Sequence, residues 1–284
     1  MALTQTEAAK LTNDLLLRGV IETIVSESAV LGSVVVLRDI SRLQELDRMK
    51  DLFVSNVSHE LRTPLANLKL YLSLLQHGRP ERRANYLSVM EREVARLERL
   101  IVDLLDLSRL QSEQRQSRPQ IREPIDLHHL IETVIQDNSA LAESKQQRLL
   151  YENPDSALPG LLGNRDQVVR MLTNLVANAI NYTPEGGLIV VRSRIQAYEQ
   201  DDPKWVMIEV TDTGIGIPTD ELSKIFERFY RGSNVNPNIP GTGLGLAIIK
   251  EIIDLHDGQI EVESQPNQGS TFRLLLPPHN TSES

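Results

Sequence analysis

The spacing of hydrophobic side chains predicts one long amphipathic helix near the start of the chain. Between residues 41 and 77, apolar side chains recur at every third or fourth position, which gathers them on one helix face. At about 100° per residue, His59 falls roughly 160° from both Val57 and Leu61. His59 is therefore predicted to stand exposed on a rigid helix. The apolar face opposite it comprises Leu46, Met49, Phe53, Val57, Leu61, Leu65, Leu68, Leu72 and Leu75.

A second helix is predicted over residues 81 to about 113, after a break at Gly78 and Pro80. Its apolar residues alternate steps of three and four, which is the heptad seam of a coiled coil. Two such helices joined by a short loop form an antiparallel hairpin, and a second copy would cover both seams in a four-helix bundle. The seam of the second helix consists of Leu87, Met90, Val94, Leu97, Ile101 and Leu104.

After residue 124 the pattern alternates between helical and β-rich segments. This mixture predicts an α+β sandwich, in which one sheet is covered by helices. The predicted helices occupy residues 125–146, 166–182, 219–230 and 243–258. The predicted strands occupy residues 148–153, 187–198 and 204–214, with a final hairpin in 259–277.

Composition excludes several classes of protein. The net charge of −9 argues against nucleic-acid binding, which needs basic surfaces. The absence of cysteine excludes disulfides and cysteine metal sites and suits a reducing compartment. The longest apolar run, residues 29–37, is far shorter than the ~20 residues of a membrane helix, and the N-terminus does not resemble a secretory signal. We therefore expect a soluble, cytoplasmic chain without a membrane segment, although a longer parent protein could carry a membrane anchor.

Three asparagines share one face of the helix predicted over residues 166–182. Asn174, Asn178 and Asn181 recur at spacings of four and three. A neutral amide oxygen suits a hard cation that phosphates also hold, such as Mg²⁺. A single asparagine would more simply be part of a polar helix face, but three in register favour a site.

Two glycine-rich segments follow. In residues 212–218, Asp212 at a strand end precedes two spaced glycines that allow close backbone approach, and its carboxylate could accept the amine of adenine. In residues 241–248, glycines open a helix whose first amides can face an anion. Each segment alone could be a simple turn, and the phosphate motif GxxxxGK[ST] is absent.

The order of these segments resembles that of the sensor histidine kinases of two-component systems. The resemblance covers roughly residues 41–278, and the second half is also similar to the wider GHKL superfamily of ATPases. The matching motifs are a phosphoacceptor box at 58–64, an N box at 174–183, a first glycine box at 212–218, an F box at 225–230 and a second glycine box at 241–248.

The resemblance implies a helical-hairpin dimerisation domain followed by an α/β sandwich ATP-binding domain of the GHKL (Bergerat) type. Residues 31–41 further resemble the last strand and exit of a PAS sensor domain. The implied organisation is a PAS-like remnant at 1–40, the hairpin at 41–115, a linker at 116–123, the ATP-binding domain at 124–278 and a disordered tail at 279–284.

The resemblance also implies roles for individual residues. His59 would be phosphorylated, Glu60 would orient its ring and take up a proton, and Thr63 would position water for dephosphorylation of the partner. The implied cofactors are ATP and Mg²⁺, with Asn178 as the metal ligand; the implied partners are a second copy and the receiver domain of a response regulator. The implied nucleotide-binding residues are Asn174, Asn178, Asn181, Tyr182, Asp212, Gly214, Gly216, Arg231, Gly241, Thr242, Gly243, Leu244 and Gly245.

One position departs from the family pattern. Asn181 stands where the family often has a lysine or arginine that holds phosphate, and Arg231 is the leading candidate to replace that charge. The lid over the nucleotide would be residues 232–240, anchored by Phe226 and Phe229 unless these are plain core aromatics. Two other functions remain open: a nucleotide-binding pseudokinase that acts as a scaffold, and a GHKL ATPase without phosphotransfer.

Overall fold

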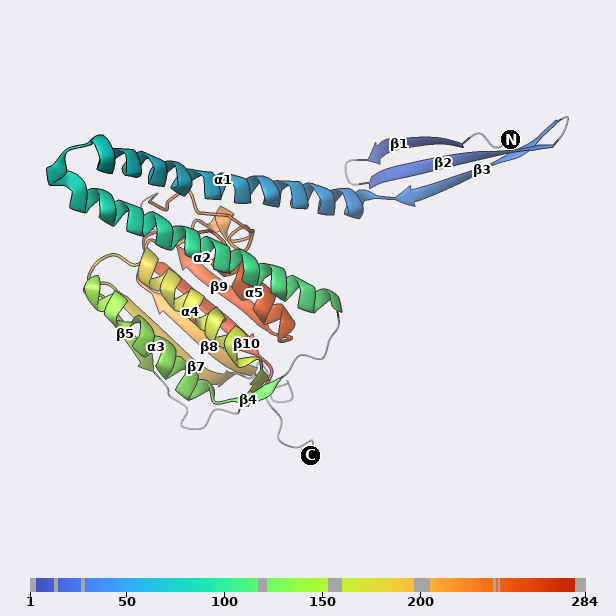
Figure 1. The fold of residues 1–284 in the computed structure, drawn as a ribbon. Helices are drawn as coiled ribbons and strands as arrows, with labels where there is room; N and C mark the ends of the chain where they lie inside the picture. Colours follow the sequence, from blue (N-terminus) through green and yellow to red (C-terminus); the bar gives the residue numbers. More distant parts are fainter. Residues whose placement is uncertain are drawn as a thin grey trace. The chain divides into compact units, whose positions relative to one another are not determined.

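The computed structural model describes residues 4–12, 15–26, 29–116, 122–152, 160–196, 205–236, 239 and 241–278. The chain divides into two compact units, residues 1–63 and residues 64–284. Each unit is described by itself below (Figure 1). The predicted tail at 279–284, most of the predicted linker, and residues 237, 238 and 240 of the predicted lid lie outside the described residues.

The first unit contains an antiparallel sheet and the start of a long helix. Its strands β1 (Thr4–Thr12), β2 (Leu15–Ser26) and β3 (Ala29–Asp39) pair in that order. β3 contains the single strand predicted here, whereas β1 and β2 were not predicted; the PAS assignment stays a prediction. Helix α1 (Ser41–His77) follows directly, and the backbone N–H of Ser41 donates to Asp39 Oδ1 at 2.9 Å.

The predicted break between the two long helices is confirmed. α1 ends at His77, and the next position must be a glycine, because a side chain on Gly78 would lie 2.3 Å from the carbonyl oxygen of Leu74. The short 3₁₀ turn η1 (Pro80–Arg82) leads into α2 (Arg83–Gln116). Further along the two helices, Asn67 Nδ2 donates to Glu93 Oε1 at 2.9 Å, which links α1 to α2.

The second unit continues as the predicted α+β sandwich. Its main sheet has the order β5-β7-β8-β10-β9, with only β5 and β7 parallel. Helices α3, α4 and α5 cover one face of this sheet (Figure 1). The helices are α3 (Leu127–Ser144), α4 (Arg165–Tyr182) and α5 (Gly245–Leu255). The strands are β5 (Arg148–Glu152), β7 (Leu188–Gln196), β8 (Trp205–Asp212), β9 (Gln259–Gln265) and β10 (Gly269–Leu276).

Two parts of this unit differ from the prediction. A small ladder of β4 (Glu123–Ile125) and β6 (Leu161–Gly163) was not predicted, since each strand is only three residues long. The helix predicted over 219–230 is wrong: only a 3₁₀ turn, η2 (Thr219–Glu221), forms there. Phe229 has a φ of 64°, and its N–H donates to the carbonyl of Gly243 at 2.9 Å instead of continuing a helix. No described helix combines the length and the hydropathy needed to cross a membrane.

Candidate active site

His59 stands on the exposed side of α1, as predicted. Its side chain is 76% exposed, and its Nδ1 lies 3.8 Å from Glu60 Oε1. That separation is longer than a hydrogen bond, but a small change in the side-chain torsions of the two residues would close it. One turn later, the Thr63 hydroxyl donates to the carbonyl of His59 at 3.4 Å. The structure therefore brings these three predicted residues together on one side of one helix.

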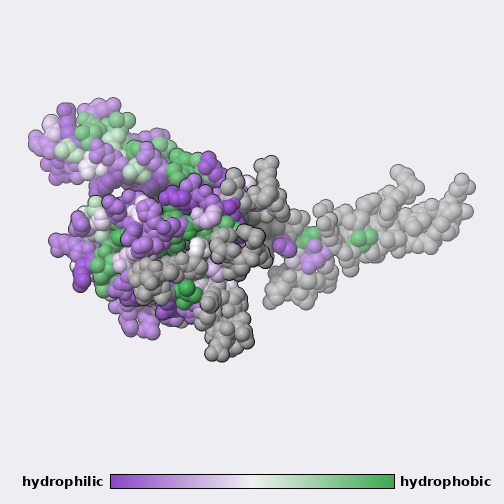
Figure 2. All heavy atoms as spheres, turned by 90° about the horizontal axis from the view of Figure 1, so that it is seen from below, coloured by the Kyte–Doolittle hydropathy of each residue, from purple (hydrophilic) through white to green (hydrophobic). Residues whose placement is uncertain are grey.

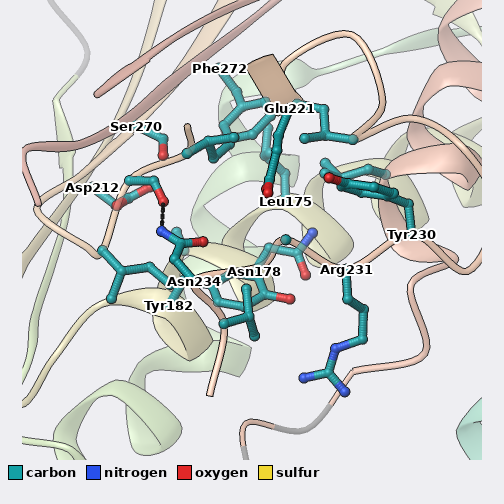
Figure 3. A pocket seen from close by; sticks show the side chains of 18 of the residues that line it. Leu175, Asn178, Tyr182, Asp212, Glu221, Tyr230, Arg231, Asn234, Ser270 and Phe272 are labelled. Atoms are coloured by element: carbon teal, nitrogen blue, oxygen red, sulfur yellow. Dashed lines mark hydrogen bonds between the residues drawn. The ribbon is translucent and has the colours of Figure 1, made fainter. Parts of the chain in front are cut away.

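A pocket opens in the second unit between α4, the end of β8 and the segment after η2 (Figure 3). It contains about 700 Å³ of empty space when the open solvent at its mouth is included. Asn178 and Tyr182 reach it from α4, and Asp212 reaches it from β8. Much of the remaining lining is apolar and includes Leu175, Val210, Ile215, Ile225 and Phe272.

Asp212 is a buried carboxylate at the end of β8 in this pocket. Its Oδ1 accepts the N–H of Gly214 at 2.7 Å. Burial raises its pKa to about 6, although hydrogen bonds from the backbone N–H groups of Gly214 and Ser270 oppose that rise. A buried acceptor next to apolar side chains fits a flat heterocycle that carries an amine.

The glycines after Asp212 are required by the chain itself. Gly216 has a φ of 65°, and a side chain there would lie 1.9 Å from the carbonyl of Gln265. A side chain on Gly214 would lie 2.6 Å from Asp212 Oδ1 and from the carbonyl of Tyr182. We expected these glycines to make room for a ligand; the observed contacts show that they first make room for neighbouring backbone and for Asp212.

Of the three asparagines predicted to share one face of α4, two lie near the start of α5 and the third contacts a lysine elsewhere. A side chain added to Gly245 would lie 3.6 Å from Asn178 Nδ2 and 4.0 Å from Asn174, so the start of α5 faces these two amides. Asn174 Nδ2 is buried and has no hydrogen-bond partner within the part of the chain that the structure describes. Asn181 instead accepts a hydrogen bond from Lys145 Nζ at 3.1 Å and is not among the residues that line the pocket.

The cation beside Asn181 is thus Lys145, not Arg231. Lys145 Nζ also donates to the carbonyl of Ile180 at 3.0 Å, and partial burial lowers its pKa. Arg231 lines the pocket, but its guanidinium donates to the carbonyls of Ile239 at 2.8 Å and Gly241 at 3.5 Å (Figure 3). Arg231 is therefore not the cation beside Asn181, and its role toward the phosphates stays a prediction.

The second glycine-rich segment packs between Tyr182 and the F box. A side chain on Gly241 would lie 3.6 Å from the hydroxyl of Tyr182. Gly243 has a φ of 70°, and a side chain there would lie within 2.8 Å of the backbone of Phe229. Leu244 is fully buried, so its side chain belongs to the core and only its backbone could serve a ligand.

Two family models match the chain over the regions just described. The model of the His Kinase A (phospho-acceptor) domain matches residues 49–113. The model of the histidine kinase-, DNA gyrase B- and HSP90-like ATPase matches residues 163–280. The chain belongs to the sensor histidine kinases.

Known proteins resemble this histidine kinase over most of its length. Drug sensory protein A of Synechocystis is 40% identical over 85% of this chain and 37% of its own length. The sensor histidine kinase WalK of Bacillus subtilis is 34% identical over 87% of this chain and 39% of its own. Full-length ShkA in complex with AMPPNP gives a TM-score of 0.56 at 26% identity, over 82% of this chain and 46% of that one. The chain thus spans about two fifths of the length of each of these two curated relatives.

Sequence reasoning missed two residues of the kinase pocket. Glu221 is buried, and its carboxylate accepts the N–H of Ser233 at 3.2 and 3.3 Å, which fixes the start of the predicted lid. Asn234 Nδ2 donates to the carbonyl of Gly216 at 2.9 Å and so reaches across the pocket from that lid (Figure 3). Glu221 was missed because its segment, residues 219–230, was predicted to be a helix. Asn234 was missed because the residues around it indicated only a turn.

The residues present fit a magnesium ion that is bound together with a phosphate. In the described ranges, no cluster of three or more His, Cys, Asp or Glu side chains could hold a metal. The amides of Asn178 and Asn174 face the start of α5, and an amide oxygen is a suitable neutral ligand. Because Mg²⁺ prefers six oxygen ligands, water and phosphate oxygens would have to supply the others.

Proposed function

We propose that this protein is an ATP-dependent protein-histidine kinase that phosphorylates His59 and passes the phosphoryl group to an aspartate of a response regulator. One observation carries most of the proposal: an exposed histidine with an adjacent carboxylate stands on a helical hairpin of a chain that also holds a pocket with a buried acceptor. Phosphoryl transfer depends on positioning the reactants and neutralising charge more than on covalent catalysis by the protein. A chain in which the histidine and the nucleotide pocket lie in separate domains suits such a reaction. We further propose a cytoplasmic location for these domains.

The hairpin would supply the nucleophile. The neutral imidazole attacks the γ-phosphorus through Nε2, a P–N bond forms, and the bond to the β–γ bridging oxygen breaks as ADP leaves. The ring is then a cation, and Glu60, which lies beside Nδ1, takes up the Nδ1 proton. The phosphorylated ring next donates the group to a receiver aspartate and returns to its starting state.

The pocket would bind the nucleotide. Asp212 would accept the adenine amine, and Tyr182 would pack against the nucleotide beside Gly241. Asn178, supported by Asn174, would hold Mg²⁺, which neutralises charge on the triphosphate when it is bound. The backbone of residues 241–245 would flank the phosphates.

The exposed hydrophobic side chains of the hairpin support a homodimer. Leu65, Leu72, Leu87, Val94 and Ile101 are each 44–50% exposed and recur at heptad spacing within each helix. Figure 2 shows hydrophobic side chains gathered on the hairpin, whose tip lies at the left end of the molecule. Pairing with a second copy would remove these side chains from water in a four-helix bundle.

The direct test is incubation with Mg²⁺ and ATP labelled in the γ-phosphate, followed by addition of a receiver-domain protein. We expect protein-bound label that is lost in acid and stable in alkali, and that moves to the receiver domain. ATP binding without any label would favour a pseudokinase scaffold. Release of phosphate without a labelled intermediate would favour a GHKL ATPase.

Replacing Asp212 by asparagine should weaken ATP binding and at the same time stabilise the fold. Loss of a buried charged acceptor is worth about 10–100-fold in affinity. The raised pKa means that the carboxyl group binds a proton more tightly in the folded state than in the unfolded state. Above pH 6 the group is ionised in both states, and its burial then lowers the free energy of unfolding by the full amount. Below pH 4 it is protonated in both states, and this cost disappears. The Asp212→Asn protein should therefore gain about 1–3 kcal/mol in free energy of unfolding at pH 7.5.

Calorimetry with ATP and urea unfolding at two pH values would check both expectations for Asp212. The gain in stability should vanish when unfolding is repeated at pH 4. Asp220, an exposed acid on η2, is the matched control, and its asparagine variant should change neither quantity. Unchanged ATP affinity in Asp212→Asn would remove Asp212 from nucleotide recognition.

Replacing Thr63 by alanine should separate the two activities of the hairpin. The hydroxyl of Thr63 lies one turn from His59 and donates to its backbone carbonyl. We therefore expect normal labelling of His59 but slower dephosphorylation of the partner, because the water-positioning hydroxyl is lost. Thr63→Ser, which keeps the hydroxyl, should restore dephosphorylation. Equal loss of labelling and dephosphorylation in Thr63→Ala would contradict this role.

A further inference from the structure

One face of α2 packs against the ATP-binding domain. Leu100, Asp103, Leu107 and Leu110 follow each other at steps of three and four and are all buried. α2 runs alongside α5 (Figure 1). Among these four residues only Asp103 carries a charge, and it is 8% exposed. A buried carboxylate in an apolar contact costs free energy unless partners satisfy it.

Asp103 finds both of its partners in the ATP-binding domain. Its Oδ2 accepts the hydroxyl proton of Thr242 at 2.8 Å. Its Oδ1 forms a close ion pair with Arg170 of α4, and Arg170 Nε also lies 3.0 Å from Asp106. Asp103 therefore makes two of the polar links between α2 and this domain. Asp106 with Arg170 and Glu113 with Gln167 make others, but of these carboxylates only Asp103 bonds to Thr242.

Thr242 connects the contact of Asp103 to the second glycine-rich segment, residues 241–245. It lies between Gly241 and Gly243, and its Oγ1 accepts the N–H of Leu244 at 3.3 Å near the start of α5. A hydroxyl has one proton to donate, and Asp103 receives it. A phosphate oxygen bound next to Thr242 could therefore not accept a hydrogen bond from its hydroxyl while Asp103 does. It would also lie about two hydrogen-bond lengths, roughly 5–6 Å, from the negative charge of the Asp103 carboxylate.

We propose that Asp103 is a latch that holds the ATP-binding domain on α2 in a state of low affinity for phosphate-bearing nucleotides. This inference rests on the proposed function, since it takes residues 241–245 as the phosphate-binding segment. Binding of ATP and engagement of Asp103 oppose each other, and by linkage each weakens the other by the same factor. With an apolar residue at position 103, the packing of α2 on the ATP-binding domain would no longer compete with the nucleotide for the hydroxyl of Thr242.

The test is the affinity of the whole 284-residue chain for ATP and for adenosine, measured by calorimetry with Mg²⁺. In Asp103→Ala, the Kd for ATP should fall about tenfold, the size of one hydrogen bond to a charged group. The Kd for adenosine should stay unchanged, because adenosine has no phosphate. Asp106→Ala is the matched control: it removes a carboxylate that pairs with the same Arg170 without touching Thr242, and it should change the ATP affinity less than twofold.

A double-mutant cycle shows whether Thr242 transmits the effect. In a Thr242→Val background, Asp103→Ala should no longer tighten ATP binding, and Asp103→Asn, which keeps the shape, should give a smaller gain in the native background. Unchanged or weaker ATP binding in Asp103→Ala overturns the latch, as does an equal gain for adenosine. A wild-type chain that binds neither ligand contradicts the proposed function itself, which distinguishes that failure from failure of the latch.

Discussion

Replacing His59 by glutamine is expected to reduce γ-phosphate labelling of the protein to background. Glutamine keeps a polar side chain on the exposed face of α1, where His59 is 76% exposed, so the helix should be undisturbed. The amide nitrogen is not a nucleophile, and no P–N bond can form. Labelling with γ-phosphate ATP, followed by acid and alkali treatment, measures the loss.

The structure provides a matched control for this variant. His77 is a second exposed histidine at the end of the same helix. His77→Gln should label at the wild-type rate. Both variants should bind ATP with unchanged affinity, because no residue that lines the pocket belongs to α1. Label that persists in His59→Gln would show that another residue accepts the phosphoryl group.

Glu60→Gln should slow labelling by about 10²–10⁴-fold, the usual effect of losing a general base. Glu60 Oε1 lies 3.8 Å from the Nδ1 of His59, on the side of the ring away from the attacking nitrogen. A neutral amide can still orient the ring but cannot take up its proton. Single-turnover labelling at saturating ATP measures the rate of this step, and the affinity for ATP should not change.

Asp51→Asn is the control for the loss of one negative charge from α1. Asp51 is exposed two and a half turns before Glu60, so its variant should label at the wild-type rate. A Glu60→Gln rate within twofold of the wild type would remove Glu60 from proton transfer. An equal slowing in both variants would instead indicate a general effect of charge on the helix.

The parts of the fold that sequence predicted well are those fixed by local periodicity. The bounds predicted for the first long helix match α1, because its apolar spacing and the glycine after His77 act within one helix turn. The exposure of His59 followed from the same periodicity. The position of Asp212 at the end of a strand followed from the β-rich segment before it, whereas its burial was not predicted.

The parts that sequence could not predict depend on pairs of residues far apart in the chain. Residues 219–230 have the composition of a helix, but the backbone of Phe229 pairs with Gly243 instead. Lys145 and Asn181 are separated by 36 positions, and nothing in either local pattern links them. Tertiary contacts override local preference in both cases, and only a structure reveals them.

The contact between Lys145 and Asn181 makes these two positions depend on each other. A lysine at position 181 would bring a second ammonium group next to Lys145 in a partly buried site, where two like charges repel strongly. A variant with a basic residue at 181 should therefore fold better when the lysine at 145 is replaced by a neutral residue. The order in which substitutions can accumulate here is thus constrained by a single hydrogen bond between two helices.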